Sequence, residues 1–471
     1  MKTTPQIKNK FTSLTKLVAA IVVTAMFQMS PVFAASQTWT NAPVSTSWTN
    51  INNWVAKAVP GIINGTGSTV SGDIATFNSP LLGGIGGAGN PIVPDDATTA
   101  NTRSRAVSGI VFDNTNCGSY VIQSPSPAVL PAAGIPATGI LFVYHNGAIR
   151  MNAPVTNNET ILEPMYVQLP SSTAGIYNLV NNSTNASAAL IISAITHGGA
   201  ATRATTFILD GTNTANNIVT NLSEGGGNAT GGFTKQNSGR WIIAGPGTFP
   251  AASPLNILGG TLVVRDAAAF GVATTATISN SVLQFDAVTL NQAALQLKTG
   301  GNLRANGAAT VNGVTVATTA ALSATLSTTS SSDVLTVGNG VNKLTGGAAD
   351  TVLHSSGTGT VLLGFDSNYA GKWAIDSGTN QLGVGTTLAL GTGASTTIAA
   401  GATLDLTPLG AVTYNLSTAA LGGSGTGTGA STAAKIRADA GATIDLATGT
   451  KGISLTFTPT AFSGDTTHPA L

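Results

Sequence analysis

Charged residues, aromatic residues and cysteine are all scarce in this 471-residue sequence. Charged residues make up 8% of the chain and aromatic residues 5%, and Cys117 is the single cysteine. One cysteine cannot close an intramolecular disulfide, so packing and backbone hydrogen bonds must hold the fold, and we expect a buried, inert thiol. So little charge also argues against a protein that binds nucleic acid or a membrane surface through electrostatics.

Low charge combined with many glycines, 57 in this chain, is often typical of disorder. Here the hydrophobic fraction is 42%, which leaves apolar surface to bury, so we expect a folded chain. Segments with apolar residues at 3.6-residue spacing are nearly missing beyond the N-terminal segment, which disfavours a helical fold.

The N-terminal segment 1–34 predicts a secretory signal peptide. A positively charged start without acidic residues precedes an apolar run at 17–27, and small residues at Val32 and Ala34 suit a cleavage site. The positive charges are those of Lys2, Lys8, Lys10 and Lys16. The apolar run is shorter than the roughly 20 residues that span a bilayer. We therefore expect cleavage after Ala34 and a secreted mature chain with a small net negative charge and no transmembrane segment.

Short apolar runs recur along the rest of the chain. Runs rich in Val, Ile, Leu, Thr and Phe alternate with Gly, Asn and Asp, which is the pattern of strands and turns. Leu262, Leu283 and Leu303 are 21 and 20 residues apart. A later set, Leu362, Leu382 and Leu404, is spaced by 20 and 22 residues. The near-copies 401–406 and 441–446 lie 40 residues apart, which is two such steps.

A persistent step of about 20 residues predicts an all-β solenoid. One coil of short strands cannot cover its own apolar side, whereas stacked coils pair their backbones and bury a shared row of Leu, Val and Ile. Alternation along a strand would turn Leu404 and Leu406 inward and Thr403 and Asp405 to water. A β-sandwich also has short recurring strands, but the persistence of the step favours the solenoid.

The region before residue 200 has a different character. It holds Trp39, Trp48 and Trp54 close together, its spacing is irregular, and it contains proline-rich loops. We interpret residues 35–200 as an N-terminal β-rich region that caps the array formed by residues 201–471. A cap is needed because an open first coil would expose unpaired N–H and C=O groups.

A stretch in the middle of the chain resembles a known repeat. Its segments are Gly231-Gly232-Phe233-Thr234-Lys235, Gly239-Arg240-Trp241, Gly259-Gly260-Thr261-Leu262 and Ala269-Phe270-Gly271. This order resembles the autotransporter-associated β-strand repeat of secreted bacterial proteins, with weaker similarity at 368–383 and 38–78. The resemblance implies a right-handed parallel β-helix at the cell surface or outside the cell, and it carries over no catalytic residue. The sequence departs from autotransporters because no membrane β-barrel segment is recognisable before Leu471.

Motifs of common catalytic and cofactor sites are missing or incomplete. Residues 84–89 fit G-x-G-x-x-G, but Asn90-Pro91 follows where a dinucleotide site needs a helix. Residues 422–427 are similar to a calcium-binding nonapeptide but have Gly427 in place of the aspartate ligand. The patterns H-E-x-x-H and G-x-S-x-G do not occur. We predict no catalytic residues, no cofactor-binding residues and no metal ligands.

The rival hypothesis is a glycan-active β-helix enzyme, either a polysaccharide lyase or a hydrolase. Such an enzyme needs carboxylates close together on one face. The candidates are Asp95 with Asp96, Glu159 with Glu163, and Asp405 with Asp445. His197 has no acidic pair near it in the sequence, and His145, His354 and His468 are scattered.

The favoured hypothesis is a secreted structural or adhesive β-solenoid without catalytic activity, located outside the cell or on its outer surface. Rows of exposed Thr, Ser and Asn suit weak, repeated binding to surface glycans. An uncapped last coil near Leu471 would also allow self-association into filaments through its open edge. No nucleic-acid partner is expected.

Overall fold

The fold was analysed in a computed structural model of the chain. It describes residues 36–63, 72–94, 105–123, 141–168, 174–197, 204–224, 231–290, 294–319, 322–383, 389–391, 396–399, 401–405, 408, 413–415, 435–437 and 443–445. In these residues the regular secondary structure is strand, apart from the 3-10 helix η1 (Ile51–Asn53), and no helix is long and apolar enough to cross a membrane. The predicted signal peptide lies outside the described residues.

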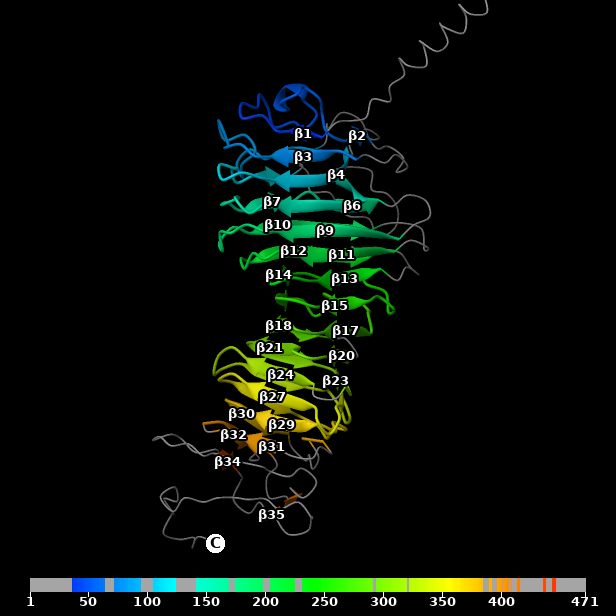
Figure 1. The fold of residues 1–471 in the computed structure, drawn as a ribbon, viewed down its shortest axis with the longest axis vertical. Helices are drawn as coiled ribbons and strands as arrows, with labels where there is room; N and C mark the ends of the chain where they lie inside the picture. Colours follow the sequence, from blue (N-terminus) through cyan, green and yellow to red (C-terminus); the bar gives the residue numbers. More distant parts are fainter. Residues whose placement is uncertain are drawn as a thin grey trace, which may run out of the picture.

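The strands stack as the rungs of a rod (Figure 1). The first rungs are built from β1 (Gln37–Thr38), β2 (Ile62–Ile63), β3 (Ile74–Phe77), β4 (Arg105–Phe112), β5 (Val121–Ile122), β6 (Leu141–Met151), β7 (Glu159–Ile161) and β8 (Met165–Gln168). Among the described residues the strand-to-strand pairings are parallel, except that β2 pairs antiparallel with β4. Parallel pairing between successive rungs is the defining feature of a β-solenoid.

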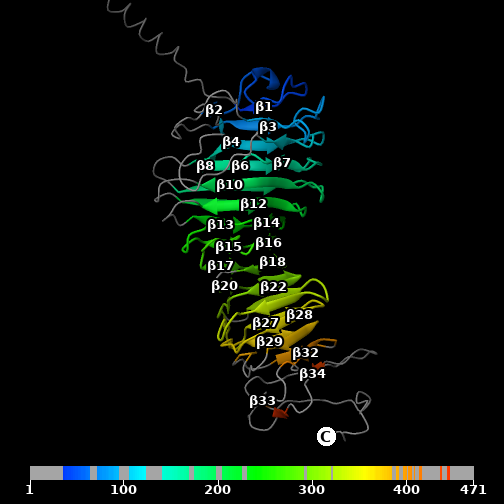
Figure 2. The ribbon, with the colours of Figure 1, turned by 180° about the vertical axis from the view of Figure 1, so that it is seen from behind.

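Two columns of strands then run down the rod and form two faces, and strands of both columns are labelled in Figures 1 and 2. The first face consists of β9 (Gly175–Asn181), β11 (Thr205–Asp210), β13 (Gly232–Lys235), β15 (Leu255–Ile257), β17 (Thr275–Ile278), β20 (Ala294–Leu297), β23 (Val314–Val316) and β26 (Leu344–Gly346). The second face consists of β10 (Leu190–His197), β12 (Asn217–Glu224), β14 (Arg240–Ile243), β16 (Thr261–Val264), β18 (Val282–Asp286), β21 (Asn302–Asn306), β24 (Ser323–Thr328), β27 (Val352–Ser356), β29 (Lys372–Ile375) and β31 (Thr396–Ile398).

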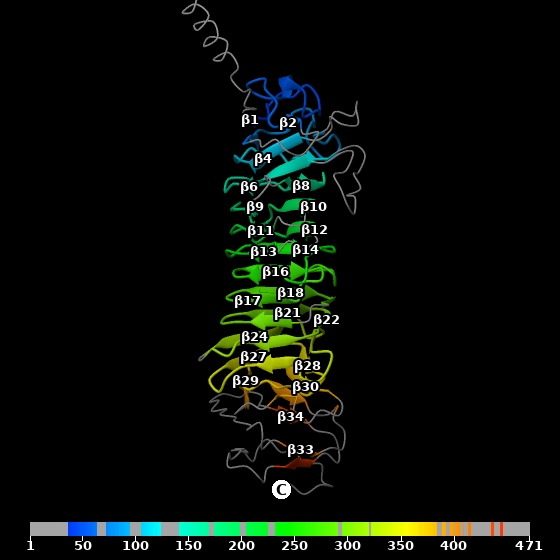
Figure 3. The ribbon, with the colours of Figure 1, turned by 90° about the vertical axis from the view of Figure 1, so that its right-hand side faces the viewer.

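A separate seven-stranded sheet begins at Thr289 and forms a third face of the later rungs (Figure 3). It consists of β19 (Thr289–Leu290), β22 (Ala308–Val311), β25 (Val334–Val337), β28 (Thr360–Leu363), β30 (Thr379–Leu382), β32 (Thr403–Asp405) and β34 (Lys435–Arg437). A separate parallel pair is formed by β33 (Thr413–Asn415) and β35 (Thr443–Asp445). These stacked parallel sheets confirm the predicted parallel β-helix.

The rungs shorten between β1 and β21 and lengthen again at β24, where Ser323 is the register partner of Val352 on β27. Gln37 on β1 has Ala75 on β3 as its register partner, whereas Leu283 on β18 has Leu303 on β21, a much shorter step along the sequence. Pairing also continues across residue 200, because β9 pairs with β11 and β10 with β12. The step of about 20 residues seen in the sequence therefore belongs to short rungs of a coil that begins near the N-terminus. In the first rungs the connections between strands are longer, which makes the spacing irregular there.

The predicted row of leucines lies in the interior. Leu262 is the register partner of Leu283, which pairs with Leu303, and Leu303 pairs with Leu326 on the next rung. All four side chains are fully buried. Each rung therefore covers the apolar side of its neighbour, as the sequence spacing predicts.

The N-terminal end of this core is closed by a cluster of aromatic rings. Trp39, Trp48 and Trp54 are buried and each has its ring within 6.0 Å of the Phe77 ring, centroid to centroid. The Trp54 indole N–H donates to the carbonyl of Trp48 at 2.7 Å. These large side chains pack together at the first described rung. The division into a capping region at 35–200 and an array at 201–471 stays a prediction.

The later leucine set is only partly in register. Leu382 pairs with Leu363 rather than with Leu362, and Leu404 pairs with Asn380. Leu362 is half-buried on the opposite side of β28. The predicted exposure of Asp405 is also wrong, because its side chain is buried and accepts a hydrogen bond from Gln381 Nε2 at 3.1 Å. Leu406 lies outside the described residues.

Buried polar side chains hold the corners of the rungs. Asn217 Oδ1 accepts from the Leu190 N–H at 2.9 Å and from Asn181 Nδ2 at 2.6 Å. Its Nδ2 donates to the Arg240 carbonyl at 2.9 Å. Asn217 therefore joins backbone groups of neighbouring rungs where the chain turns and cannot use regular strand pairing.

Lys235 is a second corner residue with its side chain buried. Its Nζ donates to the carbonyls of Gln236, Asn237 and Gly259 at 2.7, 2.9 and 3.0 Å. Burial lowers the pKa of Lys235 to about 8, and the nearby charge of Asp210 opposes that shift.

Candidate functional site: the arginine ladder

Within the described part of the chain, the predicted carboxylates do not form one site, because Glu159 and Glu163 are buried near β7, whereas Asp405 and Asp445 belong to β32 and β35. Asp95, Asp96 and residues 422–427 lie outside the described residues, as does His468. Asp405 belongs to the seven-stranded sheet and Asp445 to the separate β33–β35 pair. The alignment of these two aspartates on one face is therefore wrong.

Glu159 is buried rather than displayed. Its Oε2 accepts from the Tyr120 N–H at 3.0 Å, and Cys117 Sγ lies 3.4 Å from its Oε1. Burial raises the pKa of Glu159 well above its usual range and also raises the pKa of the Cys117 thiol. Both groups therefore favour their neutral forms, and the expectation of a buried thiol is confirmed.

The glycine-rich stretch at 84–89 forms a series of turns. Gly84 and Gly86 have positive φ angles of 73° and 95°, and the stretch leads into a short bridge between Ile92 and Ile122. A dinucleotide site needs a strand before the glycines and a helix after them. This segment has the geometry of a surface loop instead.

His197 has a carboxylate partner that the sequence did not reveal. Its Nδ1 lies 2.8 Å from Glu224 Oε1, and the two residues are register partners on β10 and β12. Both side chains are buried, and Glu224 also accepts from the Thr205 N–H at 3.2 Å. Because the pair is buried and joins strands of successive rungs, it links neighbouring coils. His354 is on the distant strand β27, where its Nδ1 meets Asp376 Oδ2 at 2.7 Å.

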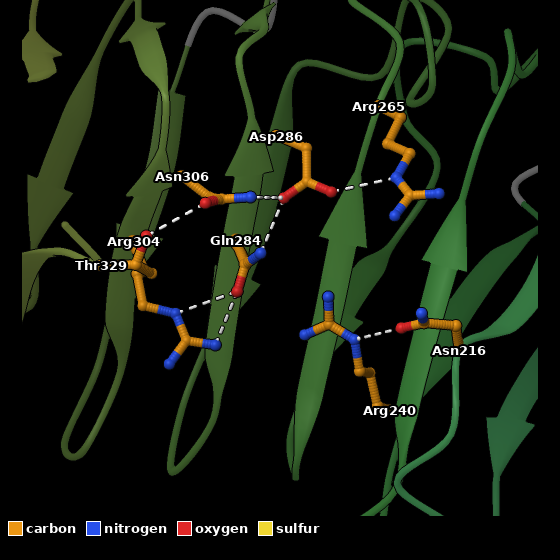
Figure 4. Close-up of polar contacts among 8 residues, drawn as sticks. All are labelled: Asn216, Arg240, Arg265, Gln284, Asp286, Arg304, Asn306 and Thr329. Atoms are coloured by element: carbon orange, nitrogen blue, oxygen red, sulfur yellow. Dashed lines mark hydrogen bonds and ion pairs between the residues drawn. The ribbon is translucent and has the colours of Figure 1, made fainter. Parts of the chain in front are cut away.

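A cluster of polar side chains lies on the outside of the rod, on the second face, and we call it the arginine ladder (Figure 4). Its members are Asn216, Arg240, Arg265, Gln284, Asp286, Arg304, Asn306 and Thr329. They come from successive rungs, beginning directly before β12 and ending directly after β24. Each rung contributes one or two side chains to this cluster, which extends along the axis of the rod. Gln284 and Arg304 are register partners, whereas Arg240 lies two positions earlier, in register with Thr261.

The upper row of the ladder follows the buried leucines at a fixed offset. Arg265, Asp286, Asn306 and Thr329 each stand three residues after Leu262, Leu283, Leu303 and Leu326. Arg265 Nε donates to Asp286 Oδ2 at 3.0 Å, and Asn306 Nδ2 donates to Asp286 Oδ1 at 3.0 Å. Thr329 Oγ1 donates to Asn306 Oδ1 at 3.1 Å. Equivalent positions on successive rungs are thus linked side chain to side chain.

In the lower row, the guanidinium groups of two further arginines donate hydrogen bonds to neutral amide oxygens. Arg304 donates to Gln284 Oε1 from Nε at 3.1 Å and from Nη2 at 2.7 Å. Arg240 Nε donates to Asn216 Oδ1 at 3.0 Å. Gln284 Nε2 in turn donates to Asp286 Oδ1 at 2.7 Å, which connects the two rows. Figure 4 shows Arg240 and Arg304 reaching toward each other from opposite sides.

The ladder carries more positive than negative charge. Burial raises the pKa of Asp286, but hydrogen bonds from Gln284, Asn306 and Arg265 outweigh it and the net shift is downward, so this carboxylate is charged. Burial lowers the pKa of Arg240 and of Arg304, each is further lowered by another arginine of the ladder, and Asp286 opposes both shifts. Arginine nevertheless stays protonated in proteins, so three guanidinium charges share one carboxylate.

The strand surface beneath the arginines is apolar and covered. Ile242 and Val263 alternate with core residues and therefore point outward, and their register partner on β18 is Gln284. Both side chains are nevertheless fully buried. Arginine can lay its apolar stem over such a surface and keep its guanidinium group at the water boundary.

The sequence did not reveal the ladder, because its hydrogen bonds join residues on different rungs of the solenoid that are distant in the sequence. The offset of three residues after each interior leucine is the signal that would have located the upper row. Searches against protein-family models, curated proteins and solved structures found no match to this chain.

Proposed function

We propose that this chain is a secreted structural and adhesive β-solenoid that works outside the cell or on its outer surface, without catalytic activity. The observation that supports it is the arginine ladder, a line of polar and charged side chains on a rigid sheet along the axis of the rod. Repeated weak contacts along one line suit attachment to an extended polymer or to a surface. The signal-peptide pattern and the resemblance to autotransporter-associated repeats point to the same compartment.

The test has a location arm and an adhesion arm. An epitope inserted at Val272, in an exposed turn, should be labelled by antibody on intact cells or recovered from the medium. Beads coated with the purified mature chain should be retained on cell-surface polysaccharide and be released by soluble polysaccharide. Recovery of the epitope only inside the cell, or no retention of the beads, would contradict the proposal.

The same preparation tests the rival glycan-active enzyme. Release of new reducing ends or of unsaturated products, lost when Asp95→Asn or Asp96→Asn is introduced, would favour a hydrolase or a lyase. Asp405→Asn serves as the matched control, because that carboxylate is buried within the sheet.

A further inference from the structure

We propose that the arginine ladder is a binding site for acidic polysaccharides, and that Arg240, Arg265 and Arg304 recognise carboxylate groups of a uronic-acid polymer. This inference rests on the proposed adhesive function and specifies the ligand class of its binding face.

The charge balance of the ladder favours an anion. Asp286 pairs directly with Arg265, whereas Arg240 and Arg304 are held by the amide oxygens of Asn216 and Gln284. Amide oxygens orient a guanidinium without neutralising it. Within the described part of the chain, the Nη atoms of Arg240 and Arg265 have no hydrogen-bond acceptor, so their donors remain for a ligand.

The guanidinium groups are preorganised and accessible. Arg240 and Arg304 project from β14 and β21, and every arginine of the ladder is fixed through its Nε by a hydrogen bond. The side chain of Arg265 is 40% exposed and that of Asp286 16% exposed. Little side-chain freedom is then lost on binding, which increases affinity. The planar fork of a guanidinium matches the two oxygens of a carboxylate.

The spacing of the ladder fits a polymer better than a single small anion. Neighbouring rungs are about 4.8 Å apart, so β14 and β21, three rungs apart, span about 14 Å. One rung is comparable with the length of one sugar residue in an extended chain. A polyuronate that runs along the rod would therefore place carboxylates at the level of Arg240, Arg265 and Arg304, and its hydroxyl groups would face the β18 rung, which carries Asp286 and no arginine. Asn306 and Thr329 continue the line with neutral groups that suit sugar hydroxyls.

The experiment measures binding of the purified mature chain to polygalacturonate by biolayer interferometry. The substitutions Arg240→Gln, Arg265→Gln and Arg304→Gln are combined in one variant. A charge-matched control combines Lys57→Gln, Arg150→Gln and Lys298→Gln, three exposed cations outside the ladder. We expect at least tenfold weaker binding for the ladder variant and less than twofold change for the control. Equal losses in the two variants would overturn the proposal, because net charge alone would then explain binding.

Two ligand arms and one further variant complete the test. Fully methyl-esterified polygalacturonate has the same backbone without charge, and we expect it to bind at least tenfold more weakly. Tighter binding to dextran sulfate than to polygalacturonate, with the same dependence on the arginines, would overturn the assignment to carboxylates. Replacement of all three arginines by lysine keeps the charge and removes the fork, so we expect an intermediate affinity. This variant also gives a readout if the glutamine variant fails to fold.

The outcomes separate this inference from the proposed function. Retention of coated beads on cell-surface polysaccharide together with no binding to polygalacturonate would overturn the ligand class and leave the adhesive role intact. Loss of bead retention would instead remove the adhesive role itself.

Discussion

Replacement of Leu283 by alanine should destabilise the rod locally and strongly. Leu283 is fully buried between its register partners Leu262 and Leu303. The change removes three carbon atoms from the core, which costs roughly 2.4 kcal/mol at about 0.8 kcal/mol for each buried methylene. A residual cavity between fixed rungs adds to that loss, so we expect a total of about 3 to 4 kcal/mol.

Hydrogen exchange followed by mass spectrometry is the suitable assay, because long repeat arrays need not unfold in one step. A loss of about 3 kcal/mol should speed exchange of the amides in β16, β18 and β21 by about a hundredfold. The control is Leu258→Ala, the same chemical change at a side chain that is 47% exposed, where we expect less than about 0.5 kcal/mol. A Leu283→Ala effect as small as that of the control would refute a shared interior row.

Three further predictions concern buried polar groups. Between pH 8 and 10.5 Lys235 is protonated in the unfolded state and neutral in the folded state, so the free energy of unfolding should rise with pH in that window. Urea titrations should give a slope of up to about 1.4 kcal/mol per pH unit. The variant Lys235→Met should abolish this slope, whereas Lys298→Met should retain it. Asn217→Ala should lower the melting temperature through a loss of about 2 to 4 kcal/mol, whereas Asn216→Ala, at an exposed site, should change stability little; similar melting temperatures would contradict the corner role. Burial raises the pKa of Glu159, so the free energy of unfolding falls as the pH rises above about 4.5, where this carboxyl ionises in the unfolded state. The variant Glu159→Gln should therefore be at least as stable as the parent chain at pH 7 and should lose that advantage near pH 4.

The parallel solenoid was predictable wherever the rungs are short. The sequence spacing of Leu262, Leu283 and Leu303 equals the register of β16, β18 and β21. In the first rungs the step is longer and varies, because connections between strands change in length at small energetic cost. A fixed sequence period therefore disappears there, although the pairing continues.

Leu362 and Asp405 show where pattern reasoning fails. In Val361-Leu362-Leu363 every residue is apolar, so composition cannot tell which side faces the core, and pairing with Leu382 selects Leu363. Asp405 ends β32, and because Leu404 and Asp405 are both buried, strict alternation does not hold there. The polar side chain of Asp405 is buried with a hydrogen-bond partner, Gln381.

The arginine ladder was not predictable from local motifs. Its contacts join residues on different rungs, such as Arg265 with Asp286 and Gln284 with Arg304. Such pairs become visible in the sequence only after the register of the strands is known. The same holds for His197 and Glu224, which are distant in the sequence and direct neighbours in the sheet.

Disulfide trapping tests the stacked parallel register most directly. In a Cys117→Ala background, the pair Thr277→Cys and Gln296→Cys joins register partners on β17 and β20. Their Cα atoms should be about 4.8 Å apart, within the range a disulfide accepts, whereas Thr277 and Thr315, two rungs apart, should be separated by about 9.6 Å. We predict that mild oxidation closes the first pair and leaves the pair Thr277→Cys and Thr315→Cys reduced. Closure of the second pair but not the first would contradict the stack.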